Sequence, residues 1–280
     1  MANHLPRDKQ IQILTMLVEG CSVRSASRMT GAHVGTILRL LARVGEGAWK
    51  VHDRVVRDVR TADVQLDEVW AFVGCKQRRL PVGEDSERGD NYTFVALDRD
   101  SKLAVTYRTG KRDGRTAGLF MADLRRRIAA GVRPQLSSDG FDAYPGAIET
   151  AFGADVDYGQ VIKDFGVEDA GRGRYSPPKV FSTEVRAVMG RPDLRRICTS
   201  HVERSNLSVR MACRRLTRLT NGFSKKLRPL RAAVSLWFAY YNLCRPHQTL
   251  RVTPAMAAGV TDRVWSVGDL MDAALAARPA

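Results

Sequence analysis

A ten-residue apolar stretch, VQLDEVWAFV at residues 64–73, constrains the fold of this chain more than any other feature. Most of its side chains are β-branched, aromatic or aliphatic, and the run is too short to favour a helix, so it predicts a buried β-strand. Asp67 lies in the middle of it. An ionised carboxylate buried without a partner costs several kcal/mol, so we expect a cation, a metal ion or a hydrogen-bond donor beside Asp67. The alternative is an aspartate at a strand end, satisfied by a salt bridge or by water.

Two further acidic residues lie in contexts that suit a shared site. Asp139 ends a short apolar segment, and Gly140 after it indicates that a strand leaves the sheet into a turn. Glu203 lies near the start of a helical pattern, on the face next to the apolar stripe and together with Arg210 and Arg214. The stripe itself consists of Val202, Val209, Cys213 and Leu216.

Two aspartates on strands and a glutamate on a helix supply the ligands that two hard divalent cations require. Carboxylate oxygens suit Mg²⁺ and Mn²⁺, and a pair of such ions stabilises both the attacking and the leaving oxygen of an in-line displacement at phosphorus. We therefore predict that Asp67, Asp139 and Glu203 form a catalytic metal site. The neighbouring acids Glu68 and Asp142 are expected to lie outside it.

At these residues the chain resembles the DDE transposases, most closely those of the insertion-sequence-1 type. The resemblance covers roughly residues 62–245, and four short motifs carry it. They are LDEVW at 66–70, DG at 139–140, ERSNLSVR at 203–210 and FSK at 223–225. In the family these motifs belong to a ribonuclease-H-like catalytic core, so the resemblance implies an α/β fold with a mixed sheet.

The resemblance also implies a mechanism and a partner. Asp67, Asp139 and Glu203 would hold two Mg²⁺ ions, with Mn²⁺ as a substitute, while Arg204 and Arg210 would hold the scissile phosphodiester. The partner would be double-stranded DNA, as element ends and as target, and we expect a homo-oligomer when the protein is assembled on DNA. Family members often carry a cysteine-rich zinc element near the N-terminus. The five cysteines here have no paired spacing, so no zinc site or disulfide framework is expected.

Residues 8–45 predict three short helices in a helix-turn-helix arrangement. Gly20 and Gly31 end the first two helices, and Ser22 can cap the second. In such a motif the last helix lies in the DNA major groove with its N-terminal residues at base edges. The expected base contacts are Ala32, His33, Gly35 and Thr36, and the expected phosphate contacts are Arg39 and Arg43. The alternative is a small packing subdomain with no role in DNA binding.

The remaining pattern predicts one larger α/β domain. Strands are expected at residues 64–73, 91–98 and 102–108, then a helix at 114–130, a strand before Asp139, a helix at 143–152 and a strand at 156–165. Three strands, helix, strand, helix, strand is the order of a ribonuclease-H-like sheet with the Asp67 strand at its centre and the Asp139 strand beside it.

The domain boundaries follow from the same pattern. Residues 1–60 would form the helix-turn-helix domain, with a linker over 45–61; residues 61–245 would form the catalytic domain, and 246–280 a tail. The inward residues of the 114–130 helix are expected to be Leu119, Phe120, Leu124 and Ile128, and Arg125, Arg126 and Arg127 to form a solvated face. Residues 166–198 resist assignment, although Arg172, Arg174 and Lys179 suit DNA contacts.

The charge of the chain points to a polyanionic partner. Lysine and arginine outnumber aspartate and glutamate by 45 to 30, a formal net charge of +15. Between residues 195 and 231 there are eleven lysines and arginines and one acid, Glu203, and we expect Arg204, Arg210 and Arg214 to contact DNA. Such a charge would also suit a ribosomal or a membrane-surface protein. No run of 18 apolar residues and no signal peptide is present, so we expect no membrane partner and a cytoplasmic location.

Together these features predict the transposase of a bacterial insertion sequence, which binds element ends and catalyses metal-dependent strand cleavage and strand transfer. Two alternatives remain open. A ribonuclease-H-like nuclease would use the same acids but would hydrolyse without joining ends. A helix-turn-helix regulator with an inactive core would bind DNA without chemistry.

Overall fold

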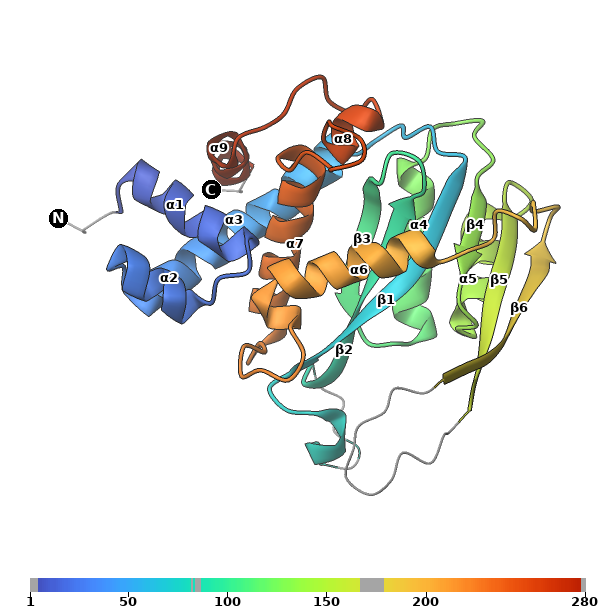
Figure 1. Ribbon diagram of the computed structural model, residues 1–280, viewed down its shortest axis with the longest axis horizontal. Coiled ribbons are helices and arrows are strands. Elements are labelled where there is room, and N and C mark those ends of the chain that lie inside the picture. Colours follow the sequence, from blue (N-terminus) through green and yellow to red (C-terminus); the bar gives the residue numbers. More distant parts are fainter. Residues whose placement is uncertain (1–4, 82, 84–86, 167–178, 278–280) are drawn as a thin grey trace.

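The computed structural model describes residues 5–81, 83, 87–166 and 179–277, and its centre is a six-stranded mixed sheet (Figure 1). The strands are β1 (Asp63–Val73), β2 (Gly89–Asp98), β3 (Ala104–Gly110), β4 (Gln135–Ser138), β5 (Asp157–Gly166) and β6 (Lys179–Met189), in the order β3-β2-β1-β4-β5-β6. β2 is antiparallel to both β1 and β3, β4 and β5 run parallel to β1, and β6 is antiparallel to β5. The predicted α/β class and the central place of the Asp67 strand are confirmed, whereas β6 lies in the segment that resisted assignment.

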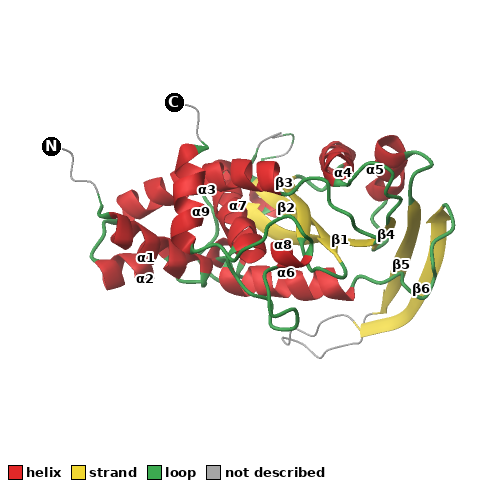
Figure 2. Ribbon diagram, turned by 90° about the horizontal axis from the view of Figure 1, so that it is seen from above, coloured by secondary structure: helices red, strands yellow, loops and turns green. Residues whose placement is uncertain are grey.

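Helices cover both faces of the sheet. α4 (Gly114–Arg127) and α5 (Ala143–Phe152) pack on one face, and α6 (Ser200–Ala212) crosses β1 and β2 on the other (Figure 2). Val202 and Val209 of the predicted stripe are buried on α6, and Cys213 and Leu216 are buried as well but lie beyond the end of this helix. Two 3₁₀ helices, η1 (Gln77–Arg79) and η2 (Arg214–Leu216), lie in the loops after β1 and α6.

A second group of helices packs beside β3. It contains α1 (Arg7–Val18), α2 (Val23–Thr30), α3 (Val34–Val55), α7 (Leu227–Leu243), α8 (Pro254–Ala257) and α9 (Val267–Ala276). The three N-terminal helices occur as predicted: Ser22 accepts a hydrogen bond from the Ser25 amide at the start of α2, and Gly31 ends α2 with φ 67°. Leu38 of α3 is 39% exposed. None of the helices in the described ranges is both long and apolar enough to cross a bilayer.

The linker predicted over residues 45–61 is wrong, because most of it belongs to α3. Gly45 and Gly47 lie within α3, where they allow other helices to approach it closely. A Cβ on Gly45 would lie 2.2 Å from the Ala232 carbonyl oxygen of α7, and one on Gly47 would lie 1.9 Å from the Ala274 carbonyl oxygen of α9. These glycines therefore let three helix backbones pack in contact.

The C-terminal residues form part of the same packing. The segment expected as a tail contains α8 and α9, and α9 packs against α3 and α1. Leu270, Met271 and Ala274 of α9 are buried. Residues from both ends of the chain thus enclose α3 and belong to one continuous hydrophobic core with the sheet.

α4 differs from its prediction at two positions. Leu119, expected inside, is 48% exposed, and Arg127, expected on a solvated face, is fully buried. The Arg127 guanidinium lies 2.7 Å from the Asp123 carboxylate of α4 and 2.8 Å from the Asp53 carboxylate of α3. A buried arginine needs such partners. This ion pair network ties the C-terminal half of α3 to the helix layer of the sheet.

Candidate active site

The register of β1 and β4 brings the first two predicted acids together. Val64 lies opposite Leu136 and Gln65 opposite Ser137 in this parallel pair. The same register, continued by two residues, places Asp67 beside Asp139, one residue past the end of β4. Because β4 is so short, the later half of β1 has no strand partner on this side. The two aspartates therefore lie where the sheet opens.

A third acid completes a tight cluster, and it is not the one we predicted. One carboxylate oxygen from each of Asp67, Glu68 and Asp139 lies within 4.8 Å of the others, in a group that could hold a metal ion. We had expected Glu68 to lie outside the site. Asp142, also expected outside, is exposed at the N-terminus of α5 and does not belong to the cluster.

Asp67 and Glu68 enter the cluster from opposite faces of β1, as adjacent strand residues do. The Asn206 side chain of α6 donates a hydrogen bond of 2.7 Å to Asp67 Oδ2. On the other face, the Tyr144 hydroxyl of α5 donates to Glu68 Oε1. Arg112 lies between Glu68 and Asp139, at 3.1 Å and 3.6 Å from their carboxylate oxygens. α5 and α6 thus each orient one acid of the cluster.

Burial shifts the proton affinity of both β1 acids. It raises the pKa of Asp67 to about 6, although the hydrogen bond from Asn206 opposes the shift and the negative charges of Asp139 and Glu203 add to it. It likewise raises the pKa of Glu68 to about 7, against the hydrogen bond from Tyr144. Like charges held close together in a partly buried site favour either a proton or a divalent cation.

Glu203 lies outside this cluster. Its carboxylate accepts a hydrogen bond of 2.7 Å from the Thr199 hydroxyl and lies 2.6 Å from the Lys163 ammonium group of β5. The side chain is 46% exposed. Asn206, which contacts Asp67, follows Glu203 by about one helical turn, so both lie on the same side of α6. The structure therefore places the third predicted acid next to the cluster, held by a lysine.

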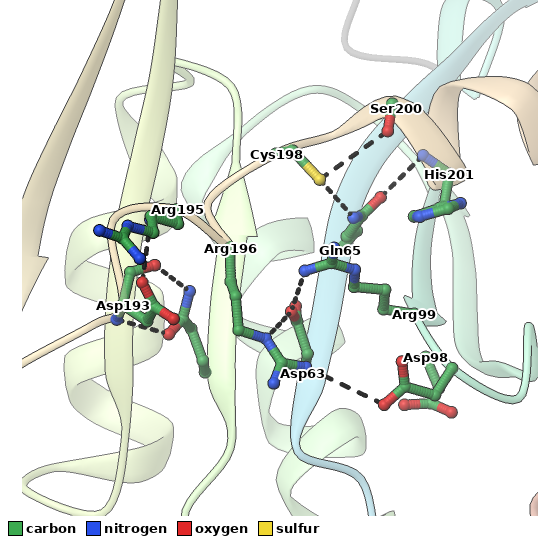
Figure 3. A network of polar contacts seen from close by, with 12 residues as sticks. Asp63, Gln65, Asp98, Arg99, Asp193, Arg195, Arg196, Cys198, Ser200 and His201 are labelled. Carbon is green, nitrogen blue, oxygen red and sulfur yellow. Dashed lines mark hydrogen bonds and ion pairs between the residues drawn. The ribbon is translucent and has the colours of Figure 1, made fainter.

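Gln65 fixes the start of α6 relative to β1 (Figure 3). α6 has no capping side chain of its own. Instead, the side-chain oxygen Oε1 of Gln65 accepts hydrogen bonds from the His201 amide at 2.9 Å and the Val202 amide at 3.1 Å. Gln65 Nε2 donates to Cys198 Sγ at 3.0 Å. Because Gln65 and Asp67 are two residues apart, they face the same side of β1. One strand therefore carries both the first acid and the cap that positions Glu203 and Asn206 above it.

The segment before α6 is held to the same strand by a buried ion pair. Asp63 is fully buried and lies 3.1 Å from an Arg99 nitrogen and 3.2 Å from an Arg196 nitrogen (Figure 3). Gln135 of β4 exchanges two hydrogen bonds with the Asp193 backbone nearby. The signal that could have indicated this anchoring was the polar pair Asp63 and Gln65 at the start of an apolar strand.

We expect Gln65→Leu to lower the free energy of unfolding by about 1–2 kcal/mol, because it removes the acceptor of two helix N-terminal amides. Gln65→Glu should recover most of this loss, because a carboxylate accepts the same two hydrogen bonds and suits the positive end of the helix. Chemical denaturation of the three proteins checks both results. Equal stability of Gln65→Leu and the wild type would show that α6 does not depend on this cap.

The pKa shift of Asp67 predicts a pH-dependent stability difference. A folded pKa of about 6, above the ordinary aspartate value of 3.8, destabilises the folded protein progressively as the pH rises between these values. Without metal, Asp67→Asn should therefore be more stable than the wild type by on the order of 2–3 kcal/mol at pH 7, and the difference should shrink toward pH 4. Denaturation in chelator at several pH values tests this. A difference that stays constant over the whole range would contradict the shifted pKa.

The residues predicted to contact DNA at the N-terminus are mostly accessible. His33, Arg39 and Arg43 are exposed. His33 caps α3, because its Nδ1 accepts a hydrogen bond of 3.1 Å from the Gly35 amide, and Arg39 donates one of 3.2 Å to the half-buried Thr36. Ala32 is only 5% exposed, so its side chain cannot contact a base edge.

The arginines predicted to contact DNA from the core differ in exposure. Arg204 and Arg214 are exposed, whereas Arg210 is half-buried, and its Nε is buried with no hydrogen-bond partner in the described part of the chain. Asp67 is close enough to raise the pKa of Arg210, although burial lowers it overall. Arg172, Arg174 and the side chain of Lys179 lie outside the described residues.

Comparison with known proteins does not extend this picture. No protein-family model matches the chain, and none of the curated proteins is similar to it.

Proposed function

We propose that this protein is a DNA transposase of the DDE type, which binds the ends of a mobile element and catalyses metal-dependent strand cleavage and strand transfer. The observation that supports this proposal best is the pairing of Asp67 with Asp139 at the open end of two parallel strands, under a helix that carries Glu203. The β1–β4 register brings Asp67 and Asp139 together, and α6 carries Glu203 next to them, outside the acid cluster.

The strand order gives independent support for a ribonuclease-H-like core. In that fold three antiparallel strands come first, and two parallel strands then extend the sheet beyond the first strand. β1 to β5 follow this order, with β6 as an additional antiparallel edge strand.

The donor set fits a hard divalent cation. Asp67, Glu68 and Asp139 offer only oxygen atoms, and Asn206 beside them has a buried Oδ1 with no hydrogen-bond partner among the described residues. Carboxylate and amide oxygens are ligands that Mg²⁺ and Mn²⁺ accept. A bound pair of ions would activate water, and later a 3′-hydroxyl, and would stabilise the leaving oxygen.

The side chains themselves would hold and orient the substrate. Asn206 fixes one oxygen of Asp67, and Gln65 fixes the helix from which Glu203 approaches. Arg210 has a buried nitrogen without a partner near Asp67, and it suits a phosphodiester oxygen in this position. Exposed His33, Arg39 and Arg43 at the far end of the helical region would bind the element end, and we expect two or more copies to assemble on DNA.

The test of this proposal is strand transfer by an Asp67→Cys variant. A thiolate is a soft ligand that Mg²⁺ avoids and Mn²⁺ accepts better. We expect the wild type to cleave and join element-end DNA in Mg²⁺ or Mn²⁺, and Asp67→Cys to be inactive in Mg²⁺ and partly active in Mn²⁺. Activity of the wild type in chelator would overturn the metal mechanism.

One observation favours a regulator with an inactive core as the second candidate. In the structure, Arg112 bridges Glu68 and Asp139, and Lys163 pairs with Glu203, so two cations already neutralise acids of the site. Calorimetric titration with Mg²⁺ and Mn²⁺ separates the candidates. A chain that binds DNA but neither ion at millimolar concentration would be the regulator.

A further inference from the structure

A cavity of about 660 Å³ lies where α3, β3 and α7 meet, on the opposite side of β2 from the acid cluster. Its size falls within the range of small-molecule binding sites. None of the residues assigned to metal or DNA binding above lines it. The cavity therefore needs an explanation of its own.

The charges around this cavity are not balanced. Four cations line it, Lys50, Arg108, Arg228 and Arg231, against one acid, Glu46. Arg228 forms an ion pair with Glu46 at 2.5 Å. The lining of the cavity thus carries three more cations than acids.

Two of these cations are important, Arg108, which is half-buried, and Arg231, which is exposed. Arg231 Nε and Nη2 both donate hydrogen bonds to one backbone oxygen, the Thr109 carbonyl, at 3.2 Å each. The Arg108 side chain makes no hydrogen bond or ion pair within the described ranges. Burial and the positive charge of Arg231 lower its pKa, and the negative charge of Asp123 opposes that shift. The two neighbouring guanidiniums repel each other, and a bound anion would offset that repulsion.

The rest of the lining is apolar and aromatic. The Trp49 and Tyr107 rings meet edge to face at 5.5 Å, and Ala232 and Val234 of α7 lie opposite them. An inorganic anion would leave this surface uncovered. A ligand with a planar apolar body as well as an acidic group would use both parts of the cavity.

We propose that this cavity binds a nucleotide, with its phosphate on Arg108 and Arg231 and its base against Trp49. Guanidinium groups bind phosphate oxygens through paired hydrogen bonds, and bases stack on aromatic side chains. The nucleotide comes either from solution or from an unpaired position of a DNA strand. This site is separate from the acid cluster, so it does not depend on the transposase assignment.

Calorimetry on the full chain tests the proposal, with adenosine monophosphate and a short single-stranded oligonucleotide as probes. We expect at least one probe to bind, and Arg108→Met to weaken that binding by about tenfold or more. Arg54→Met, which removes an exposed arginine of α3, should bind like the wild type. Binding of the mononucleotide identifies a free ligand, and binding of the oligonucleotide alone identifies a DNA strand.

A measurement without any ligand guards against misfolded variants. Arg108→Met should melt at the same temperature as the wild type or higher, because burial disfavours the Arg108 charge more than the Asp123 carboxylate stabilises it. Added nucleotide should raise the melting temperature of the wild type and not that of Arg108→Met. Absence of binding by both probes, or equal binding by wild type and a folded Arg108→Met, would overturn the proposal.

Discussion

Asp67→Asn and Asp139→Asn will each reduce metal-dependent cleavage of element-end DNA by about a thousand-fold or more. A carboxylate ligand that positions a catalytic ion supports several kcal/mol of charge stabilisation in the transition state, and each 1.4 kcal/mol is roughly a factor of ten in rate. An amide keeps the shape of the side chain but not its charge. Single-turnover cleavage under saturating DNA measures the chemical step, and a gel-shift titration on the same proteins should show unchanged affinity for the element end.

The third ligand requires a comparison, because the acid cluster contains Glu68 where we predicted Glu203. If Lys163 releases Glu203 when metal binds, Glu203→Gln will lose activity as strongly as Asp67→Asn, and Glu68→Gln will lose much less. Asp142→Asn is the matched control, since Asp142 is an exposed acid near Asp139 that lies outside the acid cluster. Activity of Glu203→Gln near the wild-type level, with an inactive Glu68→Gln, would transfer the role to Glu68.

Much of the sheet could be predicted, because the pattern of β1 is local. An apolar run with Asp67 in its middle indicates a central strand, and Asp139 before a glycine indicates the end of another. Their pairing follows once both strands are parallel neighbours. The cluster position of Glu68 could not be predicted in this way. Alternation along a strand places the Asp67 and Glu68 side chains on opposite faces of β1. Both can reach the acid cluster only because β1 has an open edge beyond the end of β4.

Two other predictions were wrong because the same residue type occurs in two different structural roles. The predicted linker began at Gly45, but glycine permits close helix packing, and the partners of Gly45 and Gly47 in α7 and α9 lie far away in the sequence. Arg127 stands in a run of three arginines that suggested a solvated face. Its burial depends on Asp53, which belongs to a different helix. Neither contact leaves a periodic signal in the local sequence.

Removing Asp123 will be among the most destabilising single changes outside the apolar core. Asp123→Ala leaves the fully buried Arg127 with only Asp53 as an ionic partner, and breaking a buried pair in this way typically lowers the free energy of unfolding by about 3–5 kcal/mol. The exposed Arg126 also pairs with Asp123, and Arg126→Met should change the free energy by at most about 1 kcal/mol. Urea denaturation of both variants measures the difference.

The same network predicts how stability responds to acid and to replacement of the whole pair. Contacts with Arg127 hold the pKa of Asp123 at about 2 despite its burial, so the stability that this carboxylate provides is complete above pH 4 and is lost as the pH falls toward 2. A double variant, Asp123→Leu with Arg127→Met, should recover most of the loss of Asp123→Ala, because apolar side chains of similar size need no counter-ion. A double variant as unstable as the single one would mean that the charges themselves, and not the penalty of an unpaired arginine, hold α3 against α4.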